Sequence, residues 1–176
     1  MNWIKDFIPN IKKNISQTFG SEKDSKVPEG LWKSCDNCGS ILYIPELKKN
    51  SFVCSKCSYH LKINTQQRIE ITFDKDSYQS LNEEEKFRDF LNFRDTKKYK
   101  DRFQEASKKS NCDEALSIGI GEIKGIQVTT AIFEFDFLGG SMGAVVGKRF
   151  ADIVDLSLKK KIPLVCFSTS GGARMQ

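Results

Sequence analysis

The sequence lacks the long apolar run that a membrane-spanning helix requires. No stretch of its 176 residues approaches the roughly 20 consecutive apolar residues of such a helix. Residues 1–20 alternate apolar and charged side chains, so they also lack the apolar core and cleavage site of a secretory signal. We expect a short amphipathic helix and a polar linker over residues 1–30, no membrane association, and a reducing cytoplasm in which cysteines bind metal or stay free.

Two common nucleotide-binding motifs are also missing. The chain has two glycine-rich turns, but neither matches GxxxxGK[ST] or GxGxxG. A nucleotide-hydrolysing or dinucleotide-binding fold is therefore disfavoured. The net charge is +5, from 28 Lys and Arg against 23 Asp and Glu, so the composition permits an anionic partner without requiring one.

Four of the six cysteines form the most specific motif in the chain. Cys35-x-x-Cys38 and Cys54-x-x-Cys57 together make a CxxC–x15–CxxC pattern. Two such pairs complete a tetrahedral set of four thiolates for one structural Zn²⁺ and leave no open coordination position for catalysis. We therefore expect a zinc ribbon at residues 31–60. His60, the only histidine, is not expected to be a ligand because four cysteines already fill the site.

Basic and aromatic side chains also gather in the ribbon. This composition is typical of proteins that bind single-stranded nucleic acid. A module of this size has few other residues from which to build a core, however, so a structural use of the aromatics is favoured. The side chains concerned are Lys33, Lys48, Lys49, Lys56, Lys62, Trp32, Tyr43, Phe52 and Tyr59.

The rest of the chain divides at about residue 112. Residues 61–111 are charged, and the near-helical spacing of their apolar residues predicts a mainly helical connecting region. These apolar residues are Leu81, Phe87, Phe90 and Leu91.

Residues 112–176 are predicted to begin an α/β domain. Two β-rich segments, 118–123 and 126–135, flank a Lys124-Gly125 hairpin turn. A helix is expected next, and then a further strand. One hairpin, one helix and one strand cannot cover both faces of a sheet, so the domain is expected to continue beyond Gln176.

The expected helix runs from about residue 145 to 158, where apolar side chains recur at helical spacing. Ser141 is its predicted N-cap, since a serine hydroxyl can accept from the unpaired N–H groups of the first turn. The strand after it covers residues 162–167. Cys166 lies in this apolar strand and is predicted to be a small core residue.

The two glycine turns are the candidate chemical site. Gly139–Gly143 follows a strand and precedes a helix, and Ser170–Ala173 follows the next strand. Such junctions leave backbone N–H groups unsatisfied, and glycine lets a ligand approach them closely. A phosphate, a carboxylate or a developing enolate oxygen would suit these donors. Tight turns that serve only packing are the alternative.

The chain resembles the β subunit of bacterial and plastid acetyl-CoA carboxylase carboxyltransferase. Three segments in this order carry the resemblance: the ribbon, the stretch DFLGGSMGAVVG at residues 136–147, and the stretch SGGARMQ at residues 170–176. The resemblance covers nearly the whole chain and is weakest at residues 61–111. It implies a crotonase-like (ClpP-like) spiral of ββα units, preceded by the ribbon. It also implies transfer of CO₂ from carboxybiotin to acetyl-CoA, giving malonyl-CoA for fatty acid synthesis in the cytoplasm or the plastid stroma.

The resemblance also implies roles and partners. The backbone of Gly171, Gly172 and Ala173 would form an oxyanion hole for the thioester enolate, with the N–H groups of Gly172 and Ala173 as the expected donors. Gly139 and Gly140 would line the acyl-CoA channel. The partners would be an α subunit in an α2β2 heterotetramer, a biotin carboxyl carrier protein, and a biotin carboxylase. ATP would be consumed only at the biotin carboxylase. Candidates for contacts with CoA phosphates, or for ion pairs with the α subunit, are Lys148, Arg149 and Arg174, and ion pairing within the chain is the alternative.

Two other functions remain open at this point. A zinc-ribbon nucleic-acid-binding protein would bind with an affinity that falls steeply with salt and would not interact with acyl-CoA. A different biotin-dependent decarboxylase or acyl-CoA carboxylase is less compatible with the ribbon, because those relatives typically lack one.

Overall fold

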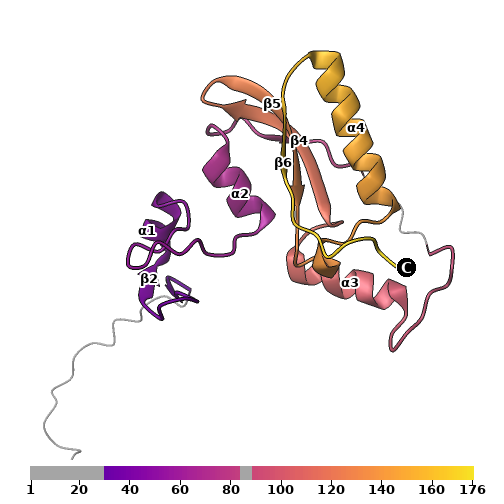
Figure 1. Ribbon diagram of the computed structural model, residues 1–176, viewed down its shortest axis with the longest axis horizontal. Helices are drawn as coiled ribbons and strands as arrows, with labels where there is room; N and C mark the ends of the chain where they lie inside the picture. Colours follow the sequence, from indigo (N-terminus) through magenta and orange to yellow (C-terminus); the bar gives the residue numbers. More distant parts are fainter. Residues whose placement is uncertain (1–29, 84–88) are drawn as a thin grey trace, which may run out of the picture.

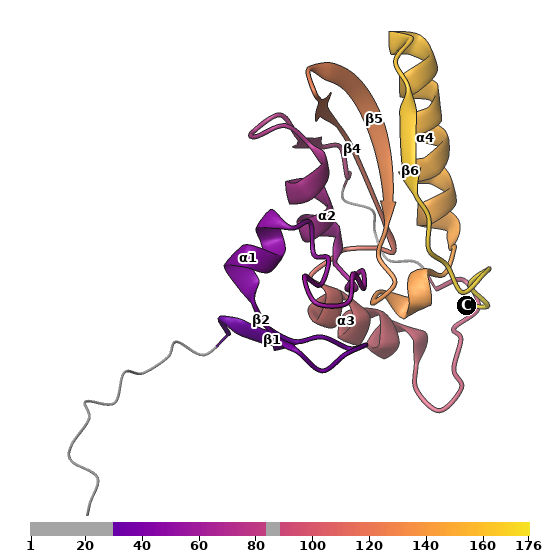
Figure 2. The same cartoon turned by 60° about the vertical axis from the view of Figure 1, so that its left-hand side comes forward.

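Figures 1 and 2 show the computed structural model, which describes residues 30–83 and 89–176. A small N-terminal module lies beside a larger unit built on a four-stranded sheet. The helix and linker predicted over residues 1–30 fall outside the described residues, except for Gly30, as does Phe87. Every helix that the structure describes is too short or too polar to cross a membrane.

The small module is a short hairpin followed by one helix. Strands β1 (Trp32–Ser34) and β2 (Ile41–Tyr43) pair antiparallel, and α1 (Ile44–Lys49) begins with a proline in its first turn, where an N–H has no helical partner in any case. An isolated antiparallel bridge between Val53 and His60 closes a second turn. The core of the module consists of Cys35, Leu42, Leu47, Phe52, Cys54 and Leu61.

The prediction for the ribbon aromatics is right only in part. Phe52 is buried in the core, but Trp32 is 53% exposed and Tyr59 is 40% exposed. Trp32 packs on Tyr43, with ring centroids 5.0 Å apart. Three of the six core residues are leucines and two are cysteines, so Phe52 is the one aromatic residue among them and the rings of Trp32 and Tyr59 stay in contact with solvent.

Two helices and a short strand form the regular part of the connecting region. Helix α2 (Thr65–Thr72) begins with a capping box, in which the side chains of Asn64 and Gln67 each accept from the backbone N–H of the other. Strand β3 is Gln79–Ser80, and helix α3 is Tyr99–Ser110. The region thus contributes elements to the larger unit as well as joining it to the ribbon.

The helix predicted from the apolar spacing of this region does not form in the described residues. Leu81 instead extends β3 by donating its N–H to the Ile118 carbonyl at 2.9 Å. Phe90 and Leu91 are exposed and belong to no helix. The spacing is therefore misleading here, because pairing with a strand takes the place of the expected helical turn.

The larger unit contains a sheet with the strand order β3-β4-β5-β6. Strands β4 (Leu116–Ile123) and β5 (Ile126–Phe133) form the predicted hairpin, and β6 (Leu164–Phe167) lies parallel to β5. Lys124 (φ 51°) and Gly125 (φ 74°) both have the positive φ that a two-residue type I′ turn requires. The α/β fold class predicted from the sequence is confirmed.

Helix α4 (Ala144–Lys160) makes the crossover that joins the parallel strands β5 and β6, and a short 3₁₀ turn, η1 (Leu138–Gly140), precedes it. The predicted helix is confirmed, but its predicted cap is wrong. Gly143 is the N-cap and has no side chain with which to cap the helix. Ser141 lies two residues before it, and its hydroxyl accepts a hydrogen bond from Arg174. Helix α4 packs against one face of the sheet through a core of Ala106, Ala115, Leu116, Ile118, Ala131, Phe137, Val146 and Ile153.

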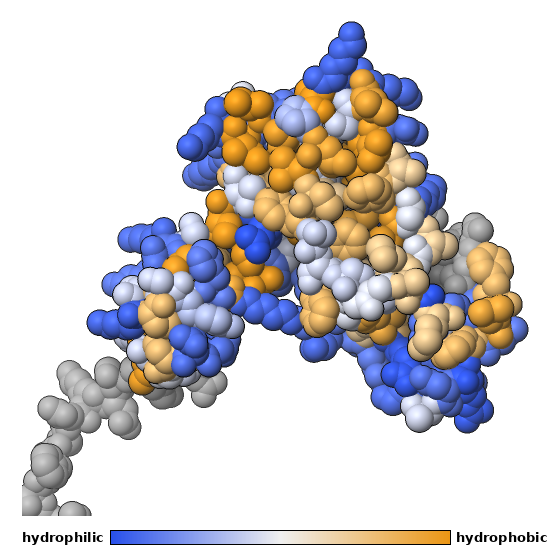
Figure 3. All heavy atoms as spheres, in the orientation of Figure 1, coloured by the Kyte–Doolittle hydropathy of each residue, from blue (hydrophilic) through white to orange (hydrophobic). Residues whose placement is uncertain are grey.

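The opposite face of the sheet is covered less completely. Phe73, at the end of α2, packs there on Val128 and Ile132, and apolar side chains gather over this part of the molecule (Figure 3). Cys166, predicted to be a core residue, is exposed. The reason is its position in β6, an edge strand of the described sheet that has a neighbouring strand on one side only.

Candidate functional site

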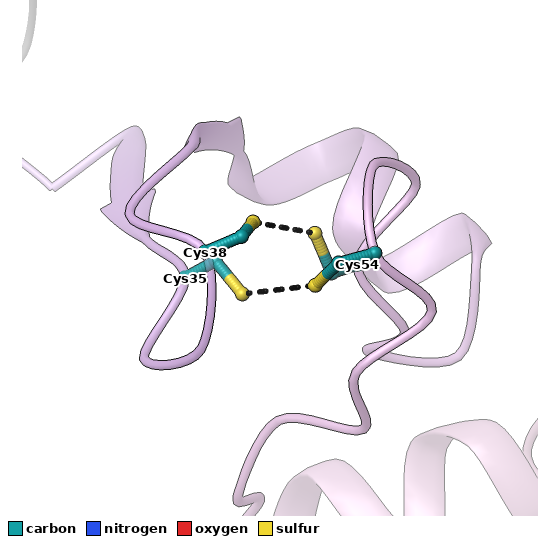
Figure 4. A group of neighbouring side chains, drawn as sticks. Cys35, Cys38 and Cys54 are labelled. Carbon is teal, nitrogen blue, oxygen red and sulfur yellow. Dashed lines mark hydrogen bonds between the residues drawn. The ribbon is translucent and has the colours of Figure 1, made fainter.

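The four cysteines of the predicted ribbon come together at one point (Figure 4). Cys35 and Cys38 lie in the turn between β1 and β2, and Cys54 and Cys57 lie in the turn after α1. The four sulfur atoms are all within 4.8 Å of one another. His60 is exposed and does not belong to this group.

The two cysteine turns have the same backbone geometry. Gly39 N–H donates to the Cys35 carbonyl and Ser58 N–H donates to the Cys54 carbonyl, both at 2.9 Å. Gly39 and Ser58 both adopt positive φ, at 69° and 58°. Each CxxC pair therefore closes a turn of the same form, and the two pairs of thiols face each other (Figure 4).

The sulfur positions fit a tetrahedral zinc ion. A Zn–S bond of about 2.3 Å implies sulfur atoms about 3.8 Å apart. The Cys35–Cys57 and Cys38–Cys54 sulfur distances are 3.7 Å and 3.8 Å. Hydrogen bonding with Ser40 lowers the pKa of Cys38 to about 6, which favours the thiolate form that zinc requires. The donor set is therefore compatible with the one structural zinc ion expected from the sequence.

The two glycine turns, which are far apart in the sequence, lie side by side. Gly171 N–H donates to the Gly139 carbonyl at 2.8 Å, and Met142 N–H donates to the Gly172 carbonyl at 2.9 Å. Arg174 N–H then donates to the Met142 carbonyl, also at 2.9 Å. These bonds form a short parallel ladder between the turns.

Gly140 allows the closest approach between the two turns. Its φ is +66°, and a Cβ atom added to it would lie 2.4 Å from the Thr169 carbonyl oxygen. Gly139 has almost the same φ, +67°, but a Cβ atom there would meet nothing within 4 Å. Of these two glycines, only Gly140 is required both for its backbone conformation and for space.

The ladder decides which of the predicted oxyanion donors remain free. Gly171 N–H is used by Gly139, and Gly172 N–H donates to the Ser170 hydroxyl at 3.1 Å. Ala173 lies between the two ladder bonds of its neighbours, so its own N–H points to the opposite edge. That N–H has no hydrogen-bond partner in the part of the chain that the structure describes. Of the three predicted donors, Ala173 N–H is the one available to a ligand.

Arg174 is a candidate for CoA binding on sequence grounds, but the structure places its side chain in the interior. The Arg174 side chain is 4% exposed, and that of its main partner, Glu114, is 3% exposed. Both Oε atoms of Glu114 accept from it, at 2.5 and 3.0 Å, and the Tyr99 hydroxyl accepts at 3.1 Å. The remaining two donors go to Ser141, at 3.1 Å to the hydroxyl and 2.8 Å to the carbonyl. All five N–H groups are thus used within the protein.

Lys148 and Arg149 also form ion pairs within this chain. Arg149 is buried and pairs with Asp113, and it donates to two backbone carbonyls. Lys148 pairs with Asp152 one helical turn away, at 2.9 Å. The ion-pair alternative therefore describes both side chains in this structure.

A buried carboxylate fixes the segment that leads into the first glycine turn. Glu134 is 3% exposed and accepts from the backbone N–H of Thr65 at 3.0 Å and from the Thr65 hydroxyl at 3.2 Å. Its other oxygen accepts from Asp136 N–H at 3.1 Å. Because Thr65 is the first residue of α2, the carboxylate also lies at the positive end of that helix. Glu134 thereby joins the residues after the ribbon to the residues before Gly139.

Replacing Glu134 with glutamine should lower the free energy of unfolding by about 1–3 kcal/mol, because one of its buried acceptor oxygens becomes an NH₂ group. Urea unfolding of the full-length chain measures the effect. The matched control is Glu122→Gln, since the Glu122 side chain is exposed, and it should change stability by no more than about 0.5 kcal/mol. Equal stability of the two variants would contradict the role assigned to Glu134.

Residues 62–176, more than half of the chain, match the family model described as the carboxyl transferase domain. The chain belongs to the carboxyl transferase domain family. Both glycine turns, the Arg174–Glu114 pair and Glu134 lie inside the matched region, whereas the four cysteines precede it. The family assignment agrees with the carboxyltransferase fold expected from the sequence.

Solved structures similar to this carboxyl transferase domain include transcarboxylase 12S with methylmalonyl-coenzyme A bound, at 24% identity and a TM-score of 0.48 over 65% of this chain and 20% of that one. The geranyl-CoA carboxylase β subunit of P. aeruginosa is 16% identical, with a TM-score of 0.45 over 75% of this chain and 20% of that one. A Pseudomonas malonate decarboxylase heterodimer is 19% identical, with a TM-score of 0.44 over 65% and 39%. The match spans about a fifth of the length of the first two of these proteins.

Sequence reasoning missed Glu114, Tyr99 and Glu134. Glu114 is separated from its partner Arg174 by 60 positions, and Glu134 is separated from Thr65 by 69. No local pattern marks an acidic residue whose partner is that distant. The one available signal is a charged residue next to an apolar strand, since Glu114 stands just before β4 and its buried first residue.

Proposed function

We propose that this member of the carboxyl transferase domain family is the β subunit of an acetyl-CoA carboxylase carboxyltransferase. The observation that supports this most directly is the pairing of the two glycine turns, which leaves the Ala173 N–H without a partner among the described residues. The four-cysteine site ahead of the family region supports the choice of this subunit, because the resemblance drawn from the sequence includes a zinc ribbon at that place.

The chemistry requires a donor such as Ala173 N–H. Loss of a methyl proton from acetyl-CoA places negative charge on the thioester oxygen, and removing one preorganised N–H donor from such an oxygen costs about 3–4 kcal/mol of barrier. In this proposal Ala173 N–H points at that oxygen. Carboxybiotin on the carrier protein supplies the CO₂ when it is bound, and the product is malonyl-CoA.

A pocket beside Gly139 supports the placement of an acyl-CoA molecule there. A pocket of about 380 Å³ lies beside Gly139, and its lining includes the apolar Leu138 and Phe135, the basic Arg102 and Lys109, and the acidic Glu105 and Asp136. The apolar and basic part of this lining suits a ligand with an acyl chain and phosphates. In this proposal Gly139 and its neighbour in the turn, Gly140, line the acyl-CoA channel.

A role for Arg174 in binding CoA is not part of the proposal. Its five donors are used internally, so none is left for a phosphate. Arg102 and Lys109 line the pocket beside Gly139 and are more exposed than Arg174, at 33% and 69% of their side chains. They pair with Asp95 and Asp136, so a phosphate bound there would replace these carboxylates as their partner.

The proposal includes the partners that this reaction needs. The α subunit, in an α2β2 heterotetramer, would supply the carboxybiotin side of the site, the carrier protein would deliver the biotin, and a separate biotin carboxylase would consume the ATP. The proposed role is the synthesis of malonyl-CoA for fatty acid production, in the cytoplasm or the plastid stroma.

The test is the reverse reaction. We expect the full-length chain, co-expressed with its cognate α subunit, to decarboxylate malonyl-CoA in the presence of biocytin, and the chain without the α subunit to be inactive. Zinc measured on the same sample should be about one ion per chain, as one four-thiolate site requires.

A complex that forms and binds zinc but does not decarboxylate malonyl-CoA would overturn the proposal. It would favour the nucleic-acid alternative, which gains support from the exposed rings of Trp32 and Tyr59 beside exposed lysines of the ribbon. An affinity for single-stranded nucleic acid that falls steeply with salt would then be the expected signature.

A further inference from the structure

We propose that Arg174 is a positioning residue, whose guanidinium, oriented by Glu114, holds Ser141 against the second glycine turn and thereby fixes the direction of the Ala173 N–H. This inference rests on the proposed function, in which that N–H binds the thioester oxygen. Arg174 itself touches neither substrate nor reacting atoms in this account.

Arg174 is bonded to the opposite turn through both its backbone and its side chain. Its backbone N–H donates to the Met142 carbonyl at 2.9 Å, and its side chain returns to both the hydroxyl and the carbonyl of Ser141. One residue thus holds two consecutive residues of the first glycine turn. Met142 in turn donates to the Gly172 carbonyl, so the peptide plane of Ala173 lies between two fixed ladder bonds.

The guanidinium has little freedom of its own. Its five N–H groups all have acceptors, and its central carbon lies 5.6 Å from the centre of the fully buried Phe137 ring. Gly143 adds a steric limit, since a Cβ atom there would lie 3.1 Å from Nη1 of Arg174. The position of Ser141 is therefore set by the Glu114–Arg174 pair.

A buried ion pair suits positioning better than it suits stability. Removing two charges from water is costly, and an apolar pair of similar size is often as stable, so stability alone is a weak reason for the Arg174–Glu114 pair. A planar guanidinium with five donors in fixed directions does, however, define the relative placement of several acceptors, which a lysine ammonium cannot do. The pair is thus well matched to the task of holding two turns in one arrangement.

The test compares Arg174→Lys with the matched control Arg149→Lys in the full-length chain assembled with its α subunit. Arg149 is also a buried arginine that pairs with a carboxylate and donates to backbone carbonyls, but it holds α4 and not the turns. We expect kcat of Arg174→Lys for malonyl-CoA decarboxylation to fall about 100-fold, as small misplacements of a catalytic group can cause. KM should change little, and Arg149→Lys should lose stability but keep its kcat.

Amide hydrogen exchange supplies a readout that does not depend on activity. Arg174→Lys should accelerate exchange at the amides of Met142 and of residue 174 relative to Arg149→Lys, because the ladder bonds open more often. Equal exchange at these amides in the two variants, or equal losses of kcat, would overturn the inference. A wild-type complex without decarboxylation activity would overturn the proposed function instead, and hydrogen exchange would still decide whether Arg174 holds the turns.

Discussion

Replacing Cys54 with serine is expected to reduce bound zinc from about one ion per chain to well below one and to unfold the ribbon, because a structural zinc site needs four ligands. Cys54 is 1% exposed and belongs to the core of the module as well as to the sulfur cluster. Zinc contributes about 10–16 kcal/mol of binding free energy to small domains of this kind, far more than so small an apolar core supplies. Elemental analysis gives the zinc content, and hydrogen exchange over the ribbon reports the unfolding.

The control for this prediction is Cys166→Ser. Cys166 is exposed and lies outside the cluster, so this variant should keep its zinc and the protection of the ribbon. The sheet has its own cores, separate from that of the ribbon, and should stay folded in both variants. Full zinc content in Cys54→Ser would show that the four sulfur atoms are not the metal site.

Replacing Gly140 with alanine should separate the two glycine turns and abolish most of the proposed activity. Positive φ costs an alanine about 1–2 kcal/mol at either Gly139 or Gly140. At Gly140 the new methyl group would also be placed 2.4 Å from the Thr169 carbonyl oxygen, which is backbone and cannot rotate away. We therefore expect Gly140→Ala to be less stable than Gly139→Ala by about 1–3 kcal/mol, the usual cost of overpacking.

Urea unfolding of the two variants separates steric overlap from backbone strain, because the φ values at Gly139 and Gly140 are nearly equal, +67° and +66°. Activity measured on the same samples then tests the site. Equal stability and equal activity of the two variants would mean that the close contact between the turns is unimportant.

Local patterns predicted local structure well. The CxxC spacing predicted the convergence of the four ribbon cysteines, because a tight turn determines where two thiols point. The Lys124-Gly125 pair predicted the hairpin, since the turn type depends on those two residues. The apolar spacing after residue 144 predicted α4, which is long enough for its period to be recognised.

Contacts that join distant segments could not be predicted in this way. Ser141 has the right side chain for an N-cap, but its hydroxyl is engaged by Arg174, which is 33 positions away. Leu81 fits a helical spacing, but hydrogen bonding to Ile118 in β4 draws its backbone into an extended conformation. In both cases a tertiary partner overrides a local preference, and only the fold reveals the partner.

The arrangement of the cysteines has a consequence for the order in which the chain acquires its structure. The ribbon core extends only from Cys35 to Leu61, and the cysteines in contact across it are separated by at most 22 positions. Glu134 reaches Thr65 across 69 positions. Short loops close before long ones, and a growing chain emerges from its N-terminus. On a ribosome the ribbon can therefore bind its metal and fold before the sheet exists. Glu134 then joins the strands that are synthesised later to a module that is already folded.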